Sequence, residues 1–348
     1  MGRPTTRVIY VDARDPEEEA LWQAAQVLRS GGLVAFPTET VYGLGADATH
    51  EEAVTRLYQV KQRPPERPLI VHVTDAQQAW RLAHSVPAQA EELAQRFWPG
   101  PLTIVLPRHQ EVPRVTCGGG DTIALRAPDH PIAQGLLRLA ERPVAAPSAN
   151  LSGAVSPVTA GHVLADFEGK LEMVLDGGRC RLGIESTVLD LTCQPPRVLR
   201  PGAVSLEALR QVIGEATWAE EPLEQRYKPR AEVVLVEVQA GSERLAAVVE
   251  EARAGGDRVG LAGTAEGVRG VEADVVEVWG RRADAPGIAR NLYVCLRRLD
   301  EAAVDLIVAE GLTGPGSEAA MHRLRSAAGR IVDAEHGQER PGGEELAV

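Results

Sequence analysis

The sequence predicts two α/β domains, and three observations support this prediction. The chain has 348 residues, more than twice the roughly 150 residues of a common domain. Short apolar runs alternate with stretches of helical period along its whole length, which is typical of α/β layers. The periodicity breaks once, between Ile213 and Ala231, and we place the domain boundary there.

In the first domain, apolar runs predict strands and periodic stretches predict helices. The predicted strands are residues 8–11, 33–36, 69–73, 102–106, 122–126, 144–146, 173–175, 187–191 and 197–199. The predicted helices are residues 17–29, 51–60, 87–97, 131–140 and 205–213. Gly31 and Gly32 end the first helix, as glycine commonly does. Since several late strands follow one another through short turns, we expect a mixed sheet.

The second domain has a regular alternation of strands and helices. Strands are predicted at residues 233–238, 259–262, 275–278 and 306–309, and helices near residues 243–254, 287–299 and 317–328. This order is typical of a small Rossmann-like layer. We therefore expect one domain at 8–213, a linker at 214–230 that could act as a lid, a smaller Rossmann-like domain at 231–335, and a flexible tail at 336–348.

Charge and cysteine content exclude several classes of protein. Lys and Arg number 37 against 49 Asp and Glu, a net charge of −12, so a broad basic surface for polynucleotides is not expected. The four cysteines, Cys117, Cys180, Cys193 and Cys295, lack the spacing of a disulfide framework or a zinc site. No apolar run is long enough for a membrane span or a signal sequence. We expect a soluble cytoplasmic protein.

Residues 37–45 follow a predicted buried strand and carry two hydroxyls and two glycines. Thr38 and Thr40 point the same way if the chain stays extended, and Gly43 and Gly45 let the backbone approach a ligand. A loop with ordinary hydroxyl capping is the alternative.

Residues 61–68 combine three cations with three prolines at a strand edge. Lys61, Arg63 and Arg67 could clamp a polyphosphate, because Lys and Arg donate charge-assisted hydrogen bonds to phosphate. Lysine occurs at only three positions, against 34 arginines, so the chain uses arginine for most of its cations. A lysine at position 61 beside two arginines therefore suggests that this position requires lysine specifically. A solvated basic loop is the alternative. His72 in the next strand is either a buried core histidine or a ligand-binding group.

Polar residues at later strand ends complete the candidate crevice. Arg126, at the end of a predicted strand, is a natural carboxylate-binding group. Ser148 and Asn150 follow an apolar run and are expected at the carboxyl edge of the sheet, where α/β proteins bind ligands. Ser186 and Arg200 lie at further strand ends. To residues 98–103 we assign a structural role, and residues 311–318 are interpreted as a glycine-rich helix start rather than a phosphate loop.

Seven segments in this order resemble the YrdC domain of threonylcarbamoyl-AMP synthases. They are FPTETVYGLGADA, KQRPPERPLIVHV, WPGPLTIVL, TIALRAPDHP, PSANLSG, GIESTVLDL and VLRPG. The resemblance spans about residues 8–213. The second domain resembles the additional C-terminal domain of the long form of this enzyme.

The resemblance implies a YrdC-like twisted mixed sheet with flanking helices and an enzyme that forms threonylcarbamoyl-adenylate and pyrophosphate from L-threonine, bicarbonate or CO2, and ATP. It implies a threonine site formed by Thr40, His72, Arg126, Ser148 and Ser186. It implies an ATP site formed by Lys61, Arg63, Arg67, Thr122, Ser148, Asn150, Val158, Arg200 and Tyr227. Lys61 and Arg63 are the candidate catalytic residues.

The resemblance also implies partners. Mg²⁺ would accompany ATP, and the product would pass to a threonylcarbamoyl transferase complex that modifies tRNA, with at most a weak tRNA contact of the chain itself. The linker departs from the Pro-Gly-Met-Lys-Tyr and His-Tyr-Ala-Pro runs of the family, and we expect Tyr227 to reach the nucleotide. A non-catalytic RNA-binding factor is one alternative. A carbamoyltransferase of the hydrogenase-maturation type is another, but it needs further modules that this sequence lacks.

Overall fold

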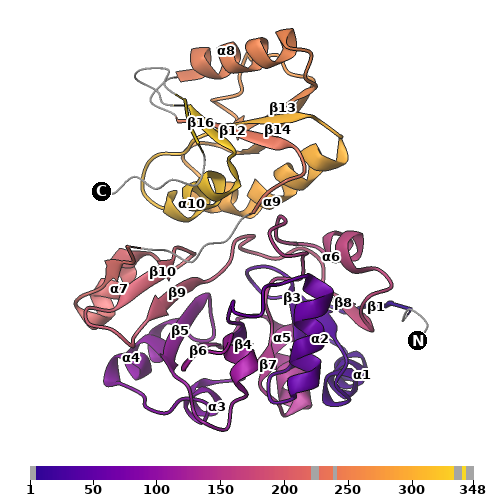
Figure 1. Ribbon diagram of the computed structural model, residues 1–348, viewed down its shortest axis with the longest axis vertical. Coiled ribbons are helices and arrows are strands. Elements are labelled where there is room, and N and C mark those ends of the chain that lie inside the picture. Colours follow the sequence, from indigo (N-terminus) through magenta and orange to yellow (C-terminus); the bar gives the residue numbers. More distant parts are fainter. Residues whose placement is uncertain (1–4, 221–226, 238–240, 333–338, 342–348) are drawn as a thin grey trace. The chain divides into compact units, whose positions relative to one another are not determined.

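In the computed structural model, the described residues are 5–220, 227–237, 241–332 and 339–341. The chain divides into two compact units. One comprises Met1–Ser152 and Ser156–Glu224, and the other comprises Gly153–Val155 and Gln225–Val348. Figure 1 shows a sheet with flanking helices in each unit. The predicted α/β class, with a mixed sheet and a second domain, is confirmed.

The first unit is built on an eleven-stranded sheet, counted over the described residues, of order β1-β8-β2-β3-β7-β4-β6-β5-β9-β10-β11. Its strands are β1 (Arg7–Tyr10), β2 (Val34–Phe36), β3 (Gly43–Asp47), β4 (Ile70–His72), β5 (Leu102–Pro107), β6 (Thr122–Arg126), β7 (Val144–Ala145), β8 (Met173–Asp176), β9 (Thr187–Asp190), β10 (Arg197–Arg200) and β11 (Thr217–Trp218). Parallel pairs such as β4 with β6 alternate with antiparallel pairs such as β5 with β6, so the sheet is mixed.

The helices of this unit place their apolar faces against the sheet. They are α1 (Glu18–Arg29), α2 (Glu51–Lys61), α3 (Ala76–Trp80), α4 (Ala88–Phe97), α5 (Pro131–Ala140), α6 (Ala160–Phe167) and α7 (Leu206–Ile213), with a 3₁₀ turn η1 (Arg114–Cys117). In α1, Leu21, Ala25 and Leu28 recur at helical spacing and are buried, so this face packs on α5 and the strands beside it. Figure 1 shows α1, α2 and α5 grouped beside these strands.

Several elements of the first unit were not predicted. Residues 43–47 form β3, although two glycines had indicated a loop. Gly45 is required there, since a Cβ atom would lie 2.9 Å from both Phe36 and Val144 of the neighbouring strands. The short α3, η1 and α6 were also missed, because each contains too few residues to show a clear period. Within the predicted linker, residues 217–218 form the edge strand β11, while residues 221–226 lie outside the described residues.

The second unit holds a six-stranded sheet, over its described part, of order β14-β13-β15-β12-β16-β17. Its elements are β12 (Glu232–Val236), α8 (Gly241–Ala254), β13 (Val259–Thr264), β14 (Val275–Gly280), α9 (Ala285–Glu301), β15 (Leu306–Glu310), α10 (Glu318–Ala327), β16 (Arg330–Val332) and β17 (Glu339–Pro341). The strands are parallel except for β17. The predicted flexible tail thus includes a short strand, and its remaining residues, 336–338 and 342–348, lie outside the described residues.

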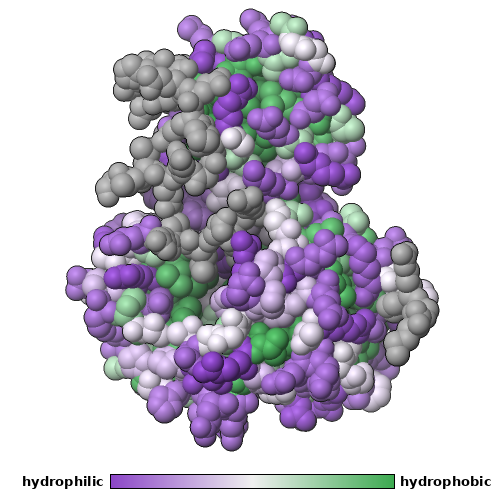
Figure 2. Space-filling model, viewed as in Figure 1, coloured by the Kyte–Doolittle hydropathy of each residue, from purple (hydrophilic) through white to green (hydrophobic). Residues whose placement is uncertain are grey.

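Each unit has a core of its own. The second unit has its own cluster of buried residues, among them Val249, Leu261 and Val308. On the face shown in Figure 2, hydrophilic residues predominate over both units. Among the described ranges, the helices are too short or too polar for any of them to cross a lipid bilayer.

Candidate functional site

The central polar residues of the first unit lie at the ends of neighbouring strands. His72 ends β4 and Arg126 ends β6, and the two are direct partners in the parallel register of these strands. Both side chains are buried, at 3% and 4% exposed. The two residues therefore lie at adjacent strand ends, at an edge where α/β sheets commonly bind ligands.

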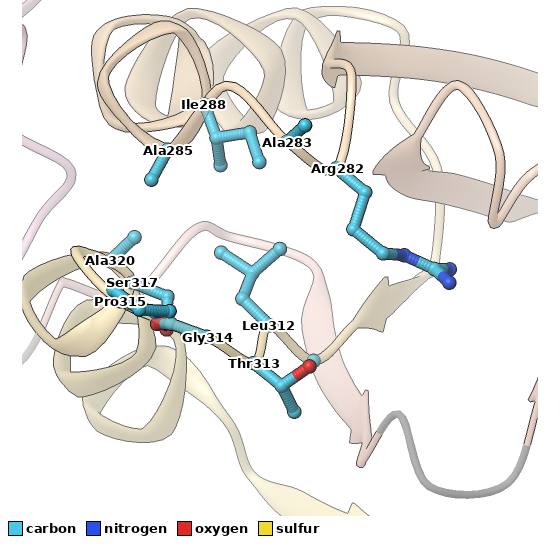
Figure 3. A pocket seen from close by; sticks show the side chains of 11 residues that line it. Arg282, Ala283, Ala285, Ile288, Leu312, Thr313, Gly314, Pro315, Ser317 and Ala320 are labelled. Atoms are coloured by element: carbon cyan, nitrogen blue, oxygen red, sulfur yellow. The ribbon is translucent and has the colours of Figure 1, made fainter.

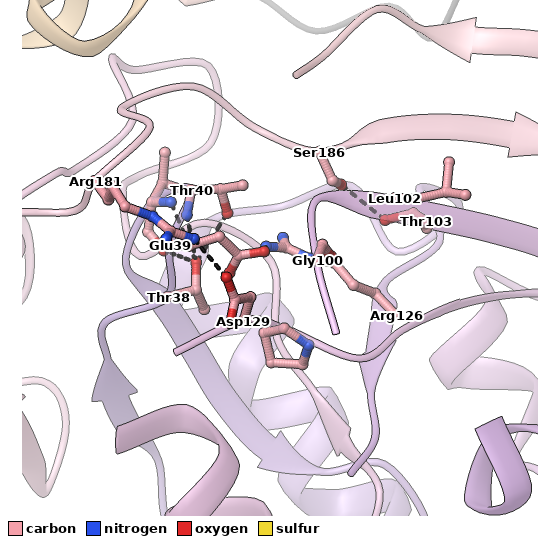
Figure 4. A network of polar contacts seen from close by, with 12 residues as sticks. Thr38, Glu39, Thr40, Gly100, Leu102, Thr103, Arg126, Asp129, Arg181 and Ser186 are labelled. Atoms are coloured by element: carbon pink, nitrogen blue, oxygen red, sulfur yellow. Dashed lines mark hydrogen bonds and ion pairs between the residues drawn. The ribbon is translucent and has the colours of Figure 1, made fainter. Parts of the chain in front are cut away.

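Arg126 is held on two sides. Its Nε donates to the Gly100 carbonyl at 3.2 Å, and its Nη2 lies 2.7 Å from Oε1 of Glu39. Glu39 is fully buried in the loop after β2, between Thr38 and Thr40. Figure 4 shows Glu39 reaching toward Arg126 from this loop.

The two threonines of the same loop bond mainly to each other and to the loop backbone. Thr38 Oγ1 donates to the Val41 carbonyl at 2.6 Å and lies 2.8 Å from Thr40 Oγ1. Thr40 is 0% exposed, so it is buried among the loop residues. Internal hydrogen bonds of this kind define the loop shape without help from a ligand.

His72 is neutral in the folded chain. Burial, followed by the charge of nearby Arg126, lowers the pKa of its imidazole to about 3. Among the described residues, its Nδ1 has no hydrogen-bond partner. A neutral imidazole with a spare nitrogen can accept from or donate to a substrate hydroxyl.

Ser186 is part of a second network. Its Oγ lies 2.7 Å from Thr103 Oγ1, and Arg200 donates from Nε to the Ser186 carbonyl and from Nη2 to the Ser186 hydroxyl, both at 3.1 Å. Thr103 and Ser186 meet because β5 and β9 are parallel neighbours. Thr103 was not predicted, since residues 98–103 were expected to be structural and its contact comes from a residue more than 80 positions away in the chain.

Lys61 joins two predicted motifs. It ends α2, is 1% exposed, and its Nζ donates to the carbonyls of Ser148 and Asn150, at 2.5 Å each. Burial, followed by the charge of Arg63, lowers the pKa of this ammonium well below its usual range. Since residues 148–150 also bond to the backbone of Tyr42 and Gly43, the three segments are held together.

Arg63 is folded along its own loop. Its Nε donates to the Arg67 carbonyl at 3.3 Å and its Nη2 to the Pro68 carbonyl at 2.9 Å. Tyr58 donates to the same Arg67 carbonyl from α2. These bonds fix the proline-rich loop in one shape, so the predicted cationic segment is pre-organised.

Two further residues of the predicted nucleotide site, Thr122 and Val158, differ in their exposure. Thr122 is exposed at the start of β6, about 13 Å along the strand from Arg126. Val158 is fully buried, and its backbone N–H and C=O are bonded to His162 and Cys180. Its side chain is therefore part of the packed interior.

Family models of known proteins match both units of the chain, between residues 26 and 329. The Sua5/YciO/YrdC family model, described as "Telomere recombination", matches residues 26–202. A model described as "Threonylcarbamoyl-AMP synthase, C-terminal domain" matches residues 204–329. The threonylcarbamoyl-AMP synthase of Pyrococcus abyssi is 46% identical over 347 residues, covering 93% of this chain and 99% of its own length. The chain belongs to the threonylcarbamoyl-AMP synthase family.

Further members support this placement. The threonylcarbamoyl-AMP synthase of Bacillus subtilis is 42% identical over 346 residues, covering 94% of this chain and 99% of its own. The crystal structure of P. abyssi Sua5 complexed with L-threonine has a TM-score of 0.88 and 45% identity, and covers 94% of this chain and 99% of that one. The resemblance seen in the sequence is thereby confirmed.

Tyr227 lies in the second unit of the chain. It is 3% exposed, stacks on Tyr293 at 5.8 Å, and lies beneath the guanidinium of Arg323 at 5.1 Å. Its neighbour Lys228 donates from the backbone to the Gly153 carbonyl. The structure thus packs Tyr227 in the core of its own unit, and its predicted nucleotide contact stays a prediction.

The second unit also contains a cavity of about 150 Å³. It lies where the chain leaves β14 and β15, and Figure 3 shows Leu312, Ile288 and Ala320 pointing into it beside Arg282. Part of the predicted glycine-rich helix start, residues 311–315 and 317, lines one side. The lining is largely apolar, and we assign it no chemistry.

Proposed function

We propose that this chain forms L-threonylcarbamoyladenylate and pyrophosphate from L-threonine, bicarbonate or CO2, and ATP. The observation that carries this proposal is the near full-length relationship to threonylcarbamoyl-AMP synthases at 42–46% identity. The cluster of buried polar residues in the first unit supports it, because the cluster combines cations, hydroxyls and one neutral imidazole.

The chemistry requires charge stabilisation more than proton transfer. The amine nitrogen of threonine forms a bond to the carbon of CO2 and releases a proton. A carbamate oxygen then attacks the α-phosphorus of ATP, and the bond to the pyrophosphate oxygen breaks. We assign Arg126 to the substrate carboxylate, and His72 with Thr40 and Ser186 to its hydroxyl. Lys61, Arg63 and Arg200 face the negative charge that develops on the phosphates.

Mg²⁺ is proposed to enter with the triphosphate. Among the described residues, no three His, Cys, Asp or Glu side chains are grouped closely enough to hold a metal ion. The residues at the nucleotide motifs are cations and hydroxyls, which bind phosphate rather than Mg²⁺. We therefore assign no protein ligand to Mg²⁺ and no step of the reaction to it.

The product is proposed to serve tRNA modification in the cytoplasm. A mixed anhydride of this kind hydrolyses easily, so a threonylcarbamoyl transferase complex that acts on tRNA adenosine 37 would have to take it up rapidly. The net charge of −12 favours at most a weak direct contact with tRNA. A purely RNA-binding role would leave the buried polar side chains of the first unit without a use.

The test is an assay of pyrophosphate release with ATP, bicarbonate and L-threonine. We expect release that depends on threonine, together with an adenylate that mass spectrometry detects. L-Serine should react weakly and L-valine hardly at all, because valine leaves buried polar groups unpaired. ATP turnover that ignores threonine, or equal rates with valine, would contradict the proposal.

A further inference from the structure

We infer that Glu39 is a positioning residue, which sets the orientation of the Arg126 guanidinium for the α-carboxylate of the amino-acid substrate. The inference rests on the proposed function, in which Arg126 binds that carboxylate. It starts from a carboxylate that sequence analysis left without a role. Glu39 is 0% exposed, and its Oε1 lies 2.7 Å from Nη2 of Arg126.

The contacts of Arg126 show what this pair achieves. Nε donates a hydrogen bond to the Gly100 carbonyl, and Nη2 forms an ion pair with Glu39 that is not a well-aligned hydrogen bond. Within the described residues, Nη1 makes neither a hydrogen bond nor an ion pair. The guanidinium is planar, so fixing two of its nitrogens fixes the direction of the third. Nη1 is therefore held ready for an incoming anion.

A purely stabilising role explains this pair poorly. Removing two charges from water costs a large desolvation free energy. Well-packed apolar residues of similar volume often stabilise a fold as well as a buried ion pair does, or better. Glu39 is also incompletely satisfied, since neither of its oxygens accepts a well-aligned hydrogen bond from the described part of the chain. A costly buried carboxylate at this position is better explained by what it does to Arg126.

The surroundings of Glu39 hold it in place. Thr38 and Thr40 flank it in a loop closed by their own hydroxyl bonds. The Glu39 carbonyl accepts from Leu182, and the Thr40 carbonyl accepts from Gly183. The carboxylate thus sits on a backbone fixed from both sides, as a positioning group requires.

The main test measures the steady-state kinetics of Glu39→Gln in the full-length protein. The amide keeps the size of the side chain but removes its charge. We expect the KM for threonine to rise about 10-fold to 100-fold, as for loss of a charged partner, while the KM for ATP stays within about twofold. Asp129→Asn is the matched control, because Asp129 is a half-exposed acid beside the same network, paired with Arg181.

A second variant separates positioning from folding. Glu39→Asp keeps the charge but withdraws the carboxylate by one methylene, so the threonine KM should also rise while the melting temperature stays close to that of the wild type. A third comparison uses Arg126→Gln. If Glu39 acts through Arg126, adding Glu39→Gln to that variant should not raise the threonine KM further.

Each other outcome overturns the inference. A wild-type threonine KM in Glu39→Gln or Glu39→Asp, an equal rise in the KM for ATP, or additive effects with Arg126→Gln would show that Glu39 does not orient Arg126. Wild-type protein that releases no pyrophosphate in response to threonine would instead overturn the proposed function, so the two failures are distinguishable.

Discussion

Arg63 contributes charge from a loop that is already fixed in shape. Replacing it with alanine removes the cation and its bonds to the Arg67 and Pro68 carbonyls. A charge-assisted contact is worth roughly 1.5 to 3 kcal/mol, so we expect kcat/KM for adenylate formation to fall about 10-fold to 150-fold. Pyrophosphate release measured at varied ATP tests this.

The control for Arg63→Ala is Arg81→Ala, since Arg81 is an exposed arginine that follows α3. It should leave kcat/KM unchanged. Near-normal activity of Arg63→Ala, or an equal loss in both variants, would remove Arg63 from the nucleotide site.

His72 gives the fold a specific pH dependence. Its pKa is about 3 when folded, against 6.5 for an unperturbed histidine. Between these values the unfolded chain binds a proton that the folded chain does not. The contribution of His72 to the free energy of unfolding is therefore fully present above pH 6.5 and is lost as the pH drops toward 3. From pH 7 to pH 5 this group should cost about 2 kcal/mol of unfolding free energy.

Urea unfolding of wild-type protein and of His72→Gln at both pH values measures this difference. The variant lacks the titrating group, so its loss of stability over the interval should be smaller by that amount. Equal losses of unfolding free energy in the two proteins would mean that folding does not lower the pKa of His72.

Individual site residues were partly accessible from the sequence. Lys61, His72, Arg126, Ser148 and Ser186 stood out because they lie at strand or helix ends within distinctive segments, and their roles stay predictions. Glu39 and Thr103 did not stand out. Their significance comes from Arg126 and Ser186, which approach them only when distant strands pair.

At the scale of elements, the backbone near Ser186 depends on a close approach by Gly202. A Cβ atom at this position would lie 2.2 Å from the Thr187 nitrogen and 2.4 Å from the Ser186 carbonyl carbon. Gly202→Ala must therefore displace the start of β9. We expect a loss of about 1–3 kcal/mol in unfolding free energy and a raised threonine KM.

Gly161→Ala is the matched control for this substitution. Gly161 lies inside α6, and the nearest atom to its Cβ would be Thr159 Oγ1 at 3.8 Å. Alanine there should stabilise the protein by about 0.5–1 kcal/mol through helix propensity. Denaturant unfolding of both variants checks the pair, and an unchanged midpoint for Gly202→Ala would contradict the argument.

Long, regular elements were predicted well, and short or glycine-rich ones were not. The predicted strand 122–126 and helix 131–140 coincide with β6 and α5, because each has a clear period and definite ends. Strand β3 was missed because its glycines serve close packing between strands rather than a turn. Strand β11 has two residues and forms only because β10 offers a free edge.

At the scale of the whole molecule, each unit has its own sheet and buried core. Of the thirteen residues that the resemblance implies for L-threonine and ATP, twelve lie within residues 1–220, and only Tyr227 lies beyond them. We therefore expect a fragment of residues 1–220 to fold and to keep threonine-dependent pyrophosphate release.

Circular dichroism melting and the pyrophosphate assay test this fragment, with the full chain as the control. A cooperative transition with measurable release is the expected outcome. A fragment that folds but releases no pyrophosphate would place an essential group beyond residue 220.

The burial of Lys61 also has a consequence for amine chemistry. Lysine occurs only at positions 61, 170 and 228, and the latter two are exposed. An acylating reagent should therefore modify Lys170 and Lys228 quickly, while Lys61 reacts only when α2 separates from the carbonyls of Ser148 and Asn150. The acylation rate at Lys61, followed by peptide mass spectrometry, therefore reports how often the end of α2 separates from residues 148–150 and how far a bound nucleotide prevents this separation.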